Sequence, residues 1–162
     1  MALGFNADEV LRMAERIEQN GARFYRKAAE SCGAAELNGC LLKLAEMEEA
    51  HAKTFADMHV ELTGAEAKPL SFDPEGETEK YLLAMADANV FDPDVDLGDA
   101  ACEMSDEEIL DVAIDLEKES IVFYLGLKEL VSSQAGKDKV EEILKEEISH
   151  IALLRDRLET LA

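Results

Sequence analysis

The sequence predicts an all-α protein, a four-helix bundle made of two antiparallel helix hairpins that a long crossover joins. Four long segments carry apolar residues at helical spacing, and none has the alternation typical of a strand. The prolines Pro69, Pro74 and Pro93 all lie in mid-chain, which indicates a connector there. With 162 residues, the chain suits a single domain over 1–162.

The first two helices are expected to form one hairpin. The first begins after Asn6, a good N-cap with Glu9 three residues later, and ends near Ser31. The second is expected over about 35–62. Because the intervening segment SCGAAE is short, the two helices should lie antiparallel.

The last two helices are expected to form the second hairpin. One begins at Ser105, which forms a capping-box pattern with Glu108, and runs to about Val131. The other is expected over about 139–161, after the break SSQAGKD. Its apolar stripe consists of Val140, Ile143, Leu154, Leu158 and Leu161. The connector 63–104 is long enough to run the length of the bundle, with a weak helix near Thr78 to Ala88, so the second and third helices should be parallel.

The two halves of the chain repeat the same polar and aromatic residues at a fixed offset. Adding 99 to positions 18, 24, 25, 48 and 51 gives residues of the same type at 117, 123, 124, 147 and 150. The repeated pairs are Glu18 and Glu117, Phe24 and Phe123, Tyr25 and Tyr124, Glu48 and Glu147, and His51 and His150. The residues between them hardly match, so the halves agree where chemistry is expected.

The four glutamates among these pairs fall on the apolar faces of their helices. Burial of a carboxylate without a partner there would cost several kcal/mol of folding free energy. Glu48 and His51 lie three residues apart, as do Glu147 and His150, so each pair projects from one helix face. Residues equidistant from a hairpin loop lie at one height, which brings all six Glu and His side chains to one level. Two divalent cations there would neutralise the four carboxylates.

Mixed carboxylate and imidazole ligands favour iron or manganese over two other common metals. Calcium prefers shells made of oxygen alone, and structural zinc sites usually close with Cys and His. The ligand types therefore predict a pair of divalent cations and leave open whether they are two iron ions, two manganese ions or a mixed pair.

The segments IEQNGARFY with EEAH, and LEKESIVFY with EISH, resemble the ferritin-like di-iron carboxylate superfamily, specifically the di-iron domain of the rubrerythrin family. This resemblance implies that Glu48 and Glu147 bridge the two metals. It also implies that Glu18 with His51, and Glu117 with His150, are the more terminal ligands.

The sequence departs from the resemblance at two places. Rubrerythrins typically carry another Glu one turn beyond the ligand of the third helix, and that position is Ser120 here. They also commonly continue into a rubredoxin domain with CxxC pairs, and this sequence ends at Ala162. The first departure argues against typical rubrerythrin ligand exchange and leaves the effect of Ser120 open, and the second predicts a separate electron donor. Tyr25 and Tyr124 lie two turns past a ligand Glu, either to hydrogen-bond a carboxylate or simply to pack in the core.

The resemblance implies a di-iron oxidoreductase that reduces hydrogen peroxide with electrons from a separate rubredoxin-like protein. The alternatives are an iron-binding ferroxidase for storage or delivery, which would use dioxygen, and a di-manganese catalase-like protein.

The net charge of −21, from 37 acidic and 16 basic residues, argues against binding to nucleic acid or anionic membranes. The lack of a secretion signal and of CxxC pairs favours the cytoplasm. A homodimer is expected, with exchange of helices between protomers left open.

Overall fold

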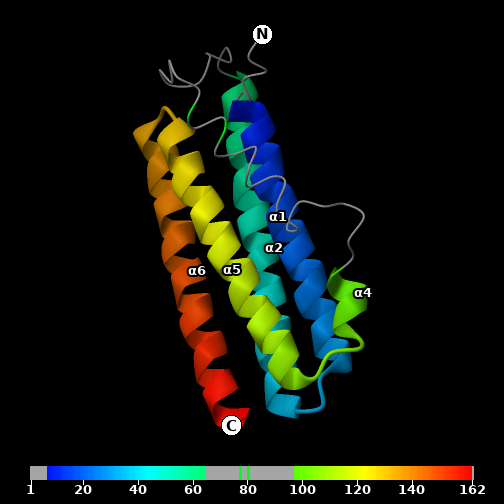
Figure 1. Cartoon of the computed structure of the whole chain (residues 1–162). Coiled ribbons are helices and arrows are strands. Elements are labelled where there is room, and N and C mark those ends of the chain that lie inside the picture. Colours follow the sequence, from blue (N-terminus) through cyan, green and yellow to red (C-terminus); the bar gives the residue numbers. More distant parts are fainter. Residues whose placement is uncertain (1–6, 65–76, 78–79, 81–96, 162) are drawn as a thin grey trace.

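The fold is an all-α bundle, as the sequence predicts. The computed structural model describes residues 7–64, 77, 80 and 97–161, and it has no strand within those ranges. The helices are α1 (Ala7–Ser31), α2 (Ala35–Gly64), α4 (Leu97–Ala101), α5 (Asp106–Leu130) and α6 (Gln134–Leu161). Figure 1 shows α1, α2, α5 and α6 as four long rods that lie side by side.

The helices form two antiparallel hairpins, α1 with α2 and α5 with α6, that pack against each other. Helix α1 packs on α5, and α2 packs on α6. Helices α2 and α5 run in the same direction, because α2 ends at the opposite end of the bundle from the start of α5 (Figure 1). A hydrogen bond of 3.0 Å from Gly33 N to Asp106 Oδ1 joins the first hairpin loop to the start of α5. The predicted topology is therefore confirmed.

Helix α6 begins five residues before the predicted start at Lys139. The backbone N–H of Gly136 donates to Ser133 Oγ at 3.0 Å, and the N–H of Lys137 donates to the Ser133 carbonyl at 3.0 Å. Ser133 therefore caps the helix, and residues after it that were expected to form a loop belong to the first turns. The prediction that Leu161 belongs to the buried stripe of this helix is also wrong, since Leu161 is 44% exposed at the helix end.

The connector differs from the expected segment at both ends. Helix α2 continues to Gly64, two residues past the predicted end at Leu62, and the short helix α4 precedes α5. Helix α4 packs against α1, and its Ala101 is fully buried. The weak helix expected near Thr78 to Ala88 lies almost entirely outside the described residues. Among the helices that the structure describes, none has the length and apolar character of a membrane span.

Two apolar clusters fill the interior of the bundle. One contains Ile17, Phe55 and Tyr124, and the other contains Tyr25 and Leu154. The Glu and His residues that the sequence analysis identifies belong to neither cluster. They lie at helix positions between the two clusters and form one polar layer, which consists of Glu18, Glu48, His51, Glu117, Glu147 and His150. Apolar side chains therefore cover this layer toward both ends of the bundle.

Helix α5 begins with the predicted capping box, and loss of this capping box should measurably destabilise the protein. Ser105 Oγ accepts a hydrogen bond from Glu108 N at 3.2 Å, and Glu108 Oε2 accepts one from Ser105 N at 2.8 Å. We expect Ser105→Ala to lower the free energy of unfolding in urea by about 1 kcal/mol. The control Ser149→Ala changes an exposed serine within α6 and should stay within about 0.5 kcal/mol of wild type. Equal stabilities of the two variants would contradict this role of Ser105.

Candidate metal centre

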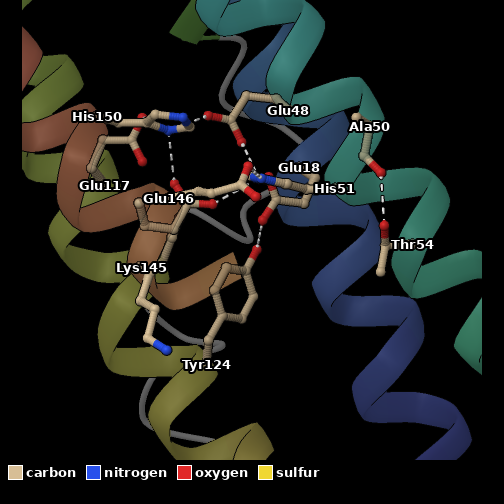
Figure 2. A network of polar contacts seen from close by, with 12 residues as sticks. Glu18, Glu48, Ala50, His51, Thr54, Glu117, Tyr124, Lys145, Glu146 and His150 are labelled. Atoms are coloured by element: carbon tan, nitrogen blue, oxygen red, sulfur yellow. Dashed lines mark hydrogen bonds and ion pairs between the residues drawn. The ribbon is translucent and has the colours of Figure 1, made fainter. Parts of the chain in front are cut away.

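The structure brings the six predicted Glu and His side chains together at one level of the bundle. Each of the four long helices contributes one Glu, and α2 and α6 each add a His from the next turn of the same face. All six are almost fully buried: Glu18, Glu48, His51, Glu117, Glu147 and His150. Figure 2 shows His51 and His150 on either side of the Glu48 carboxylate.

The six residues form two groups of possible ligand atoms that share Glu48 and Glu147. In the first group, Nδ1 of His51 lies 2.9 Å from Glu147 Oε1, 3.6 Å from Glu48 Oε2 and 3.5 Å from Glu18 Oε2. Glu18 belongs to this group alone. Each shared carboxylate turns one oxygen to this group and its other oxygen to the second.

The second group is built in the same way around His150. Its Nδ1 lies 3.1 Å from Glu147 Oε2, 3.3 Å from Glu48 Oε1 and 3.4 Å from Glu117 Oε1. Glu117 belongs to this group alone. The arrangement offers two neighbouring positions with three carboxylates and one imidazole each, and the two shared carboxylates are placed to bridge them.

The spacing of these atoms fits metal ligands better than hydrogen-bond partners. Ligand atoms about 2.1 Å from an ion lie about 3.0 Å apart in octahedral geometry and about 3.4 Å apart in tetrahedral geometry. The distances from the two Nδ1 atoms span 2.9 to 3.6 Å. His51 Nδ1, Glu48 Oε1 and Glu147 Oε1 are buried without a hydrogen bond despite these short distances. Two of these atoms, His51 Nδ1 and Glu147 Oε1, belong to the first group, and Glu48 Oε1 belongs to the second. Each position thus has at least one buried ligand atom without a hydrogen bond, and the residues present therefore fit a bound pair of cations.

The buried carboxylates fall into two classes by their affinity for protons. Burial raises the pKa of Glu18 well above its ordinary value, and the charge of Glu48 adds to the rise. Burial likewise raises the pKa of Glu117, and its contact with Glu147 adds to the rise. Burial alone would also raise the pKa of Glu48 and Glu147, but their contacts with the neighbouring glutamate and the two histidines outweigh it and lower both. In the metal-free layer, the terminal carboxylates therefore bind a proton more readily than the shared ones.

The two imidazoles take up protons in the same metal-free layer. Burial would lower the pKa of His150, but its contacts with Glu117, Glu147 and Glu48 raise that pKa to about 12. The pKa of His51 also lies well above its ordinary value, because contacts with glutamates outweigh the opposing effect of burial. Protons thus balance the buried negative charge where cations would otherwise do so.

Both predicted tyrosines hydrogen-bond a carboxylate, and each reaches across to the other hairpin. Tyr25 on α1 donates to Glu117 Oε1 on α5, and Tyr124 on α5 donates to Glu18 Oε1 on α1. Side chains on a helix point toward its N-terminus, so a ring two turns past the layer leans back to it and meets the facing helix. Figure 2 shows Tyr124 in this position. Burial raises the pKa of both phenols above the ordinary value, with neighbouring carboxylates adding to it, so both remain donors.

Loss of one of these hydroxyl groups should destabilise the metal-free protein. Tyr124→Phe keeps the packed ring and leaves the buried Glu18 oxygen without its donor. We expect the free energy of unfolding in urea to fall by about 1 to 3 kcal/mol, measured after removal of metal by a chelator. Tyr25→Phe is the matched variant in the other half and should lose a similar amount. A loss below about 0.5 kcal/mol in both variants would show that packing alone accounts for the tyrosines.

Glu146 is a contact of the site that the sequence analysis missed. Its Oε2 lies 2.8 Å from His51 Nε2, the ring nitrogen that faces away from the layer, and its side chain is 50% exposed. A carboxylate in this place orients a ligand imidazole and fixes which nitrogen carries the proton. In the sequence, Glu146 is one of many acidic residues on α6, and only its position next to Glu147 hinted at such a role.

Ser120 lies at the layer, as expected, but does not extend the carboxylate set. Its side chain is 9% exposed, and its hydroxyl donates to the Leu116 carbonyl at 3.1 Å, within its own helix. Its counterpart at the offset of 99 is Gly21, where an added Cβ would lie 3.5 Å from Glu48 Cγ. Both positions one turn past a terminal glutamate thus carry small residues.

The family model described as Rubrerythrin matches residues 9–158 of this sequence, and this range includes every residue of the layer. The chain belongs to the rubrerythrin family. It therefore carries a rubrerythrin-type di-iron domain, with a candidate metal site of buried Glu and His residues. No curated protein matches the chain significantly.

Two solved structures share the fold of this rubrerythrin-family chain. A crystal structure described as a ferritin-like diiron-carboxylate protein from Thermotoga maritima has a TM-score of 0.75 and 25% identity, and the match covers 98% of this chain and 97% of that one. A hypothetical protein from Pyrococcus furiosus has a TM-score of 0.67 and 20% identity, over 97% of this chain and 90% of that one. The second likeness concerns the fold alone. The predicted ferritin-like architecture is therefore confirmed.

Proposed function

We propose that this chain is a di-iron oxidoreductase that reduces hydrogen peroxide to water with electrons from a separate, rubredoxin-like donor protein. The observation that supports it is the pair of buried ligand groups that share Glu48 and Glu147. In the proposed reaction, one peroxide takes up two electrons and two protons and yields two waters, and the O–O bond breaks. Two adjacent redox-active ions, when bound, supply one electron each.

The residues of the layer would have different roles. Glu48 and Glu147 would hold the two metal positions close together, since each has one oxygen in the first group and its other oxygen in the second. Glu18 with His51, and Glu117 with His150, complete them. Tyr25 and Tyr124 keep their protons directed at the terminal carboxylates and so hold these in place. The apolar clusters on both sides keep bulk water from the layer.

Stopped-flow mixing tests this proposal. Protein loaded with ferrous ions is mixed with hydrogen peroxide or with dioxygen, and oxidation is followed by absorbance. We expect peroxide to oxidise the protein clearly faster than dioxygen. The control is Glu147→Gln treated in the same way, which reports oxidation of loosely bound iron.

Faster oxidation by dioxygen would contradict the proposal, and many iron atoms per chain after aerobic loading would support a ferroxidase instead. Manganese in protein purified from its native host would support the catalase-like alternative.

A further inference from the structure

The candidate metal centre is nearly two-fold symmetric, and the offset of 99 residues makes this symmetry easy to check. Each half contributes one terminal glutamate, one shared glutamate, one histidine and one tyrosine that donates to the other half. The two imidazole rings also stack, with centroids 5.8 Å apart and planes 20° apart. The ligand atoms offered to the two positions are therefore chemically the same.

The symmetry fails at the outer nitrogen of each histidine. The carboxylate oxygen Oε2 of Glu146 lies 2.8 Å from His51 Nε2. Figure 2 shows the two side chains next to each other. The residue that the offset pairs with Glu146 is Met47, because 146 minus 99 is 47. A thioether is a weak hydrogen-bond acceptor and carries no charge. In agreement, His150 Nε2 is buried and has no hydrogen-bond partner among the described residues.

This difference bears on metal binding because of how an imidazole binds a cation. When Nδ1 binds the ion, the proton resides on Nε2, and that N–H then needs an acceptor. At His51 the acceptor is an ionisable carboxylate, which also makes the ring a stronger donor. At His150 the N–H would stay buried and unpaired, which is unfavourable.

We infer that the two positions bind metal unequally, with the tighter position at His51, where Glu146 holds the ring, and the weaker one at His150. The inference rests on the proposed function in that it requires the site to hold two ions. The site then fills in order, and a state with one ion at the His51 position exists at limiting metal. Glu146 acts here as a positioning residue, since it contacts the ligand His51 and belongs to neither group of candidate ligands.

Titration of metal-free protein with Co²⁺, followed by visible absorbance, tests this inference without any turnover. We expect wild type to bind two ions in two resolved steps. Removal of an outer carboxylate costs about 10- to 100-fold in metal affinity. Because Glu146 is half-exposed, we expect Glu146→Ala to weaken the tighter step by about tenfold and to leave the weaker step unchanged.

Two further variants keep the outcome decisive. Met47→Glu would place a carboxylate at the equivalent position near His150 and should strengthen the weaker step, so that the two steps approach each other. Glu142→Ala removes an exposed charge one turn before Glu146 on the same helix and should leave both steps as in wild type. Two equal steps in wild type, or equal effects of Glu146→Ala and Glu142→Ala, would overturn the inference. Failure of wild type to bind two ions at all would instead contradict the proposed function.

Discussion

Glu147→Gln is expected to weaken metal binding at both positions of the layer. Each oxygen of Glu147 approaches the Nδ1 atom of a different histidine, at 2.9 Å for His51 and 3.1 Å for His150. Loss of an outer hydrogen-bond partner alone costs about 10- to 100-fold in affinity, so loss of an anionic ligand shared by both should exceed about 100-fold at each. The amide keeps the shape of the side chain and removes its charge. Titration with Co²⁺ after chelator treatment measures both steps.

The matched variant for this experiment is Glu18→Gln. Glu18 is equally buried, yet it belongs only to the group around His51. We therefore expect it to weaken one step and to leave the other within a few fold of wild type. If both variants affected a single step, Glu147 would not bridge, and the two groups would be independent sites. Circular dichroism of each metal-free variant checks that the helices remain folded.

Metal loading is expected to raise the thermal unfolding temperature by about 10 °C. An ion that binds only the folded state stabilises it by about 4 kcal/mol at a concentration one thousand times its Kd. In a chain of this size, each kcal/mol shifts the unfolding temperature by about 2 to 4 °C. The physical reason is that cations replace the protons that otherwise balance four buried carboxylates. Circular dichroism melts with and without Mn²⁺ measure the shift.

Calcium is the control ion for the thermal experiment. It has the same charge as Mn²⁺ but prefers shells made of oxygen alone, and each position here includes an imidazole nitrogen. We expect Ca²⁺ to raise the unfolding temperature by much less than Mn²⁺ does. Equal shifts with both ions would point to binding at the acidic surface. No shift with either ion would contradict a buried metal centre.

The sequence predicted the helices and their pairing well, because both depend on local signals. The capping box at Ser105 and the apolar spacing of the long segments set where helices form. Short breaks between helices then required antiparallel pairing. The start of α6 was misplaced because serine, glycine and aspartate near Ser133 favour a loop and a helix start alike, and only the observed cap distinguishes them.

The sequence also selected the six residues of the layer, through their offset of 99 and their symmetric distances from the hairpin loops. The observed loops fall around residues 33 and 132. Residue 33 is the midpoint between Glu18 and Glu48, and residue 132 is the midpoint between Glu117 and Glu147. This holds because the rise of a helix is constant, so equal numbers of residues on two antiparallel helices lead to equal heights. Their role as ligands remains a prediction that the titrations above test.

Which side chains meet across the two hairpins could not be predicted from the sequence. Tyr25 reaches Glu117 rather than a carboxylate of its own hairpin, and Glu146 faces His51. Both contacts depend on how one hairpin is rotated and shifted against the other, and the combined packing of many side chains sets that arrangement. By itself, the sequence determined the helices, their topology and the residues at the polar level, because these follow from short-range spacing. Only the tertiary structure decided the contacts that make the two metal positions unequal, because helix rotation brings Glu146 to one histidine and leaves Nε2 of the other unpaired.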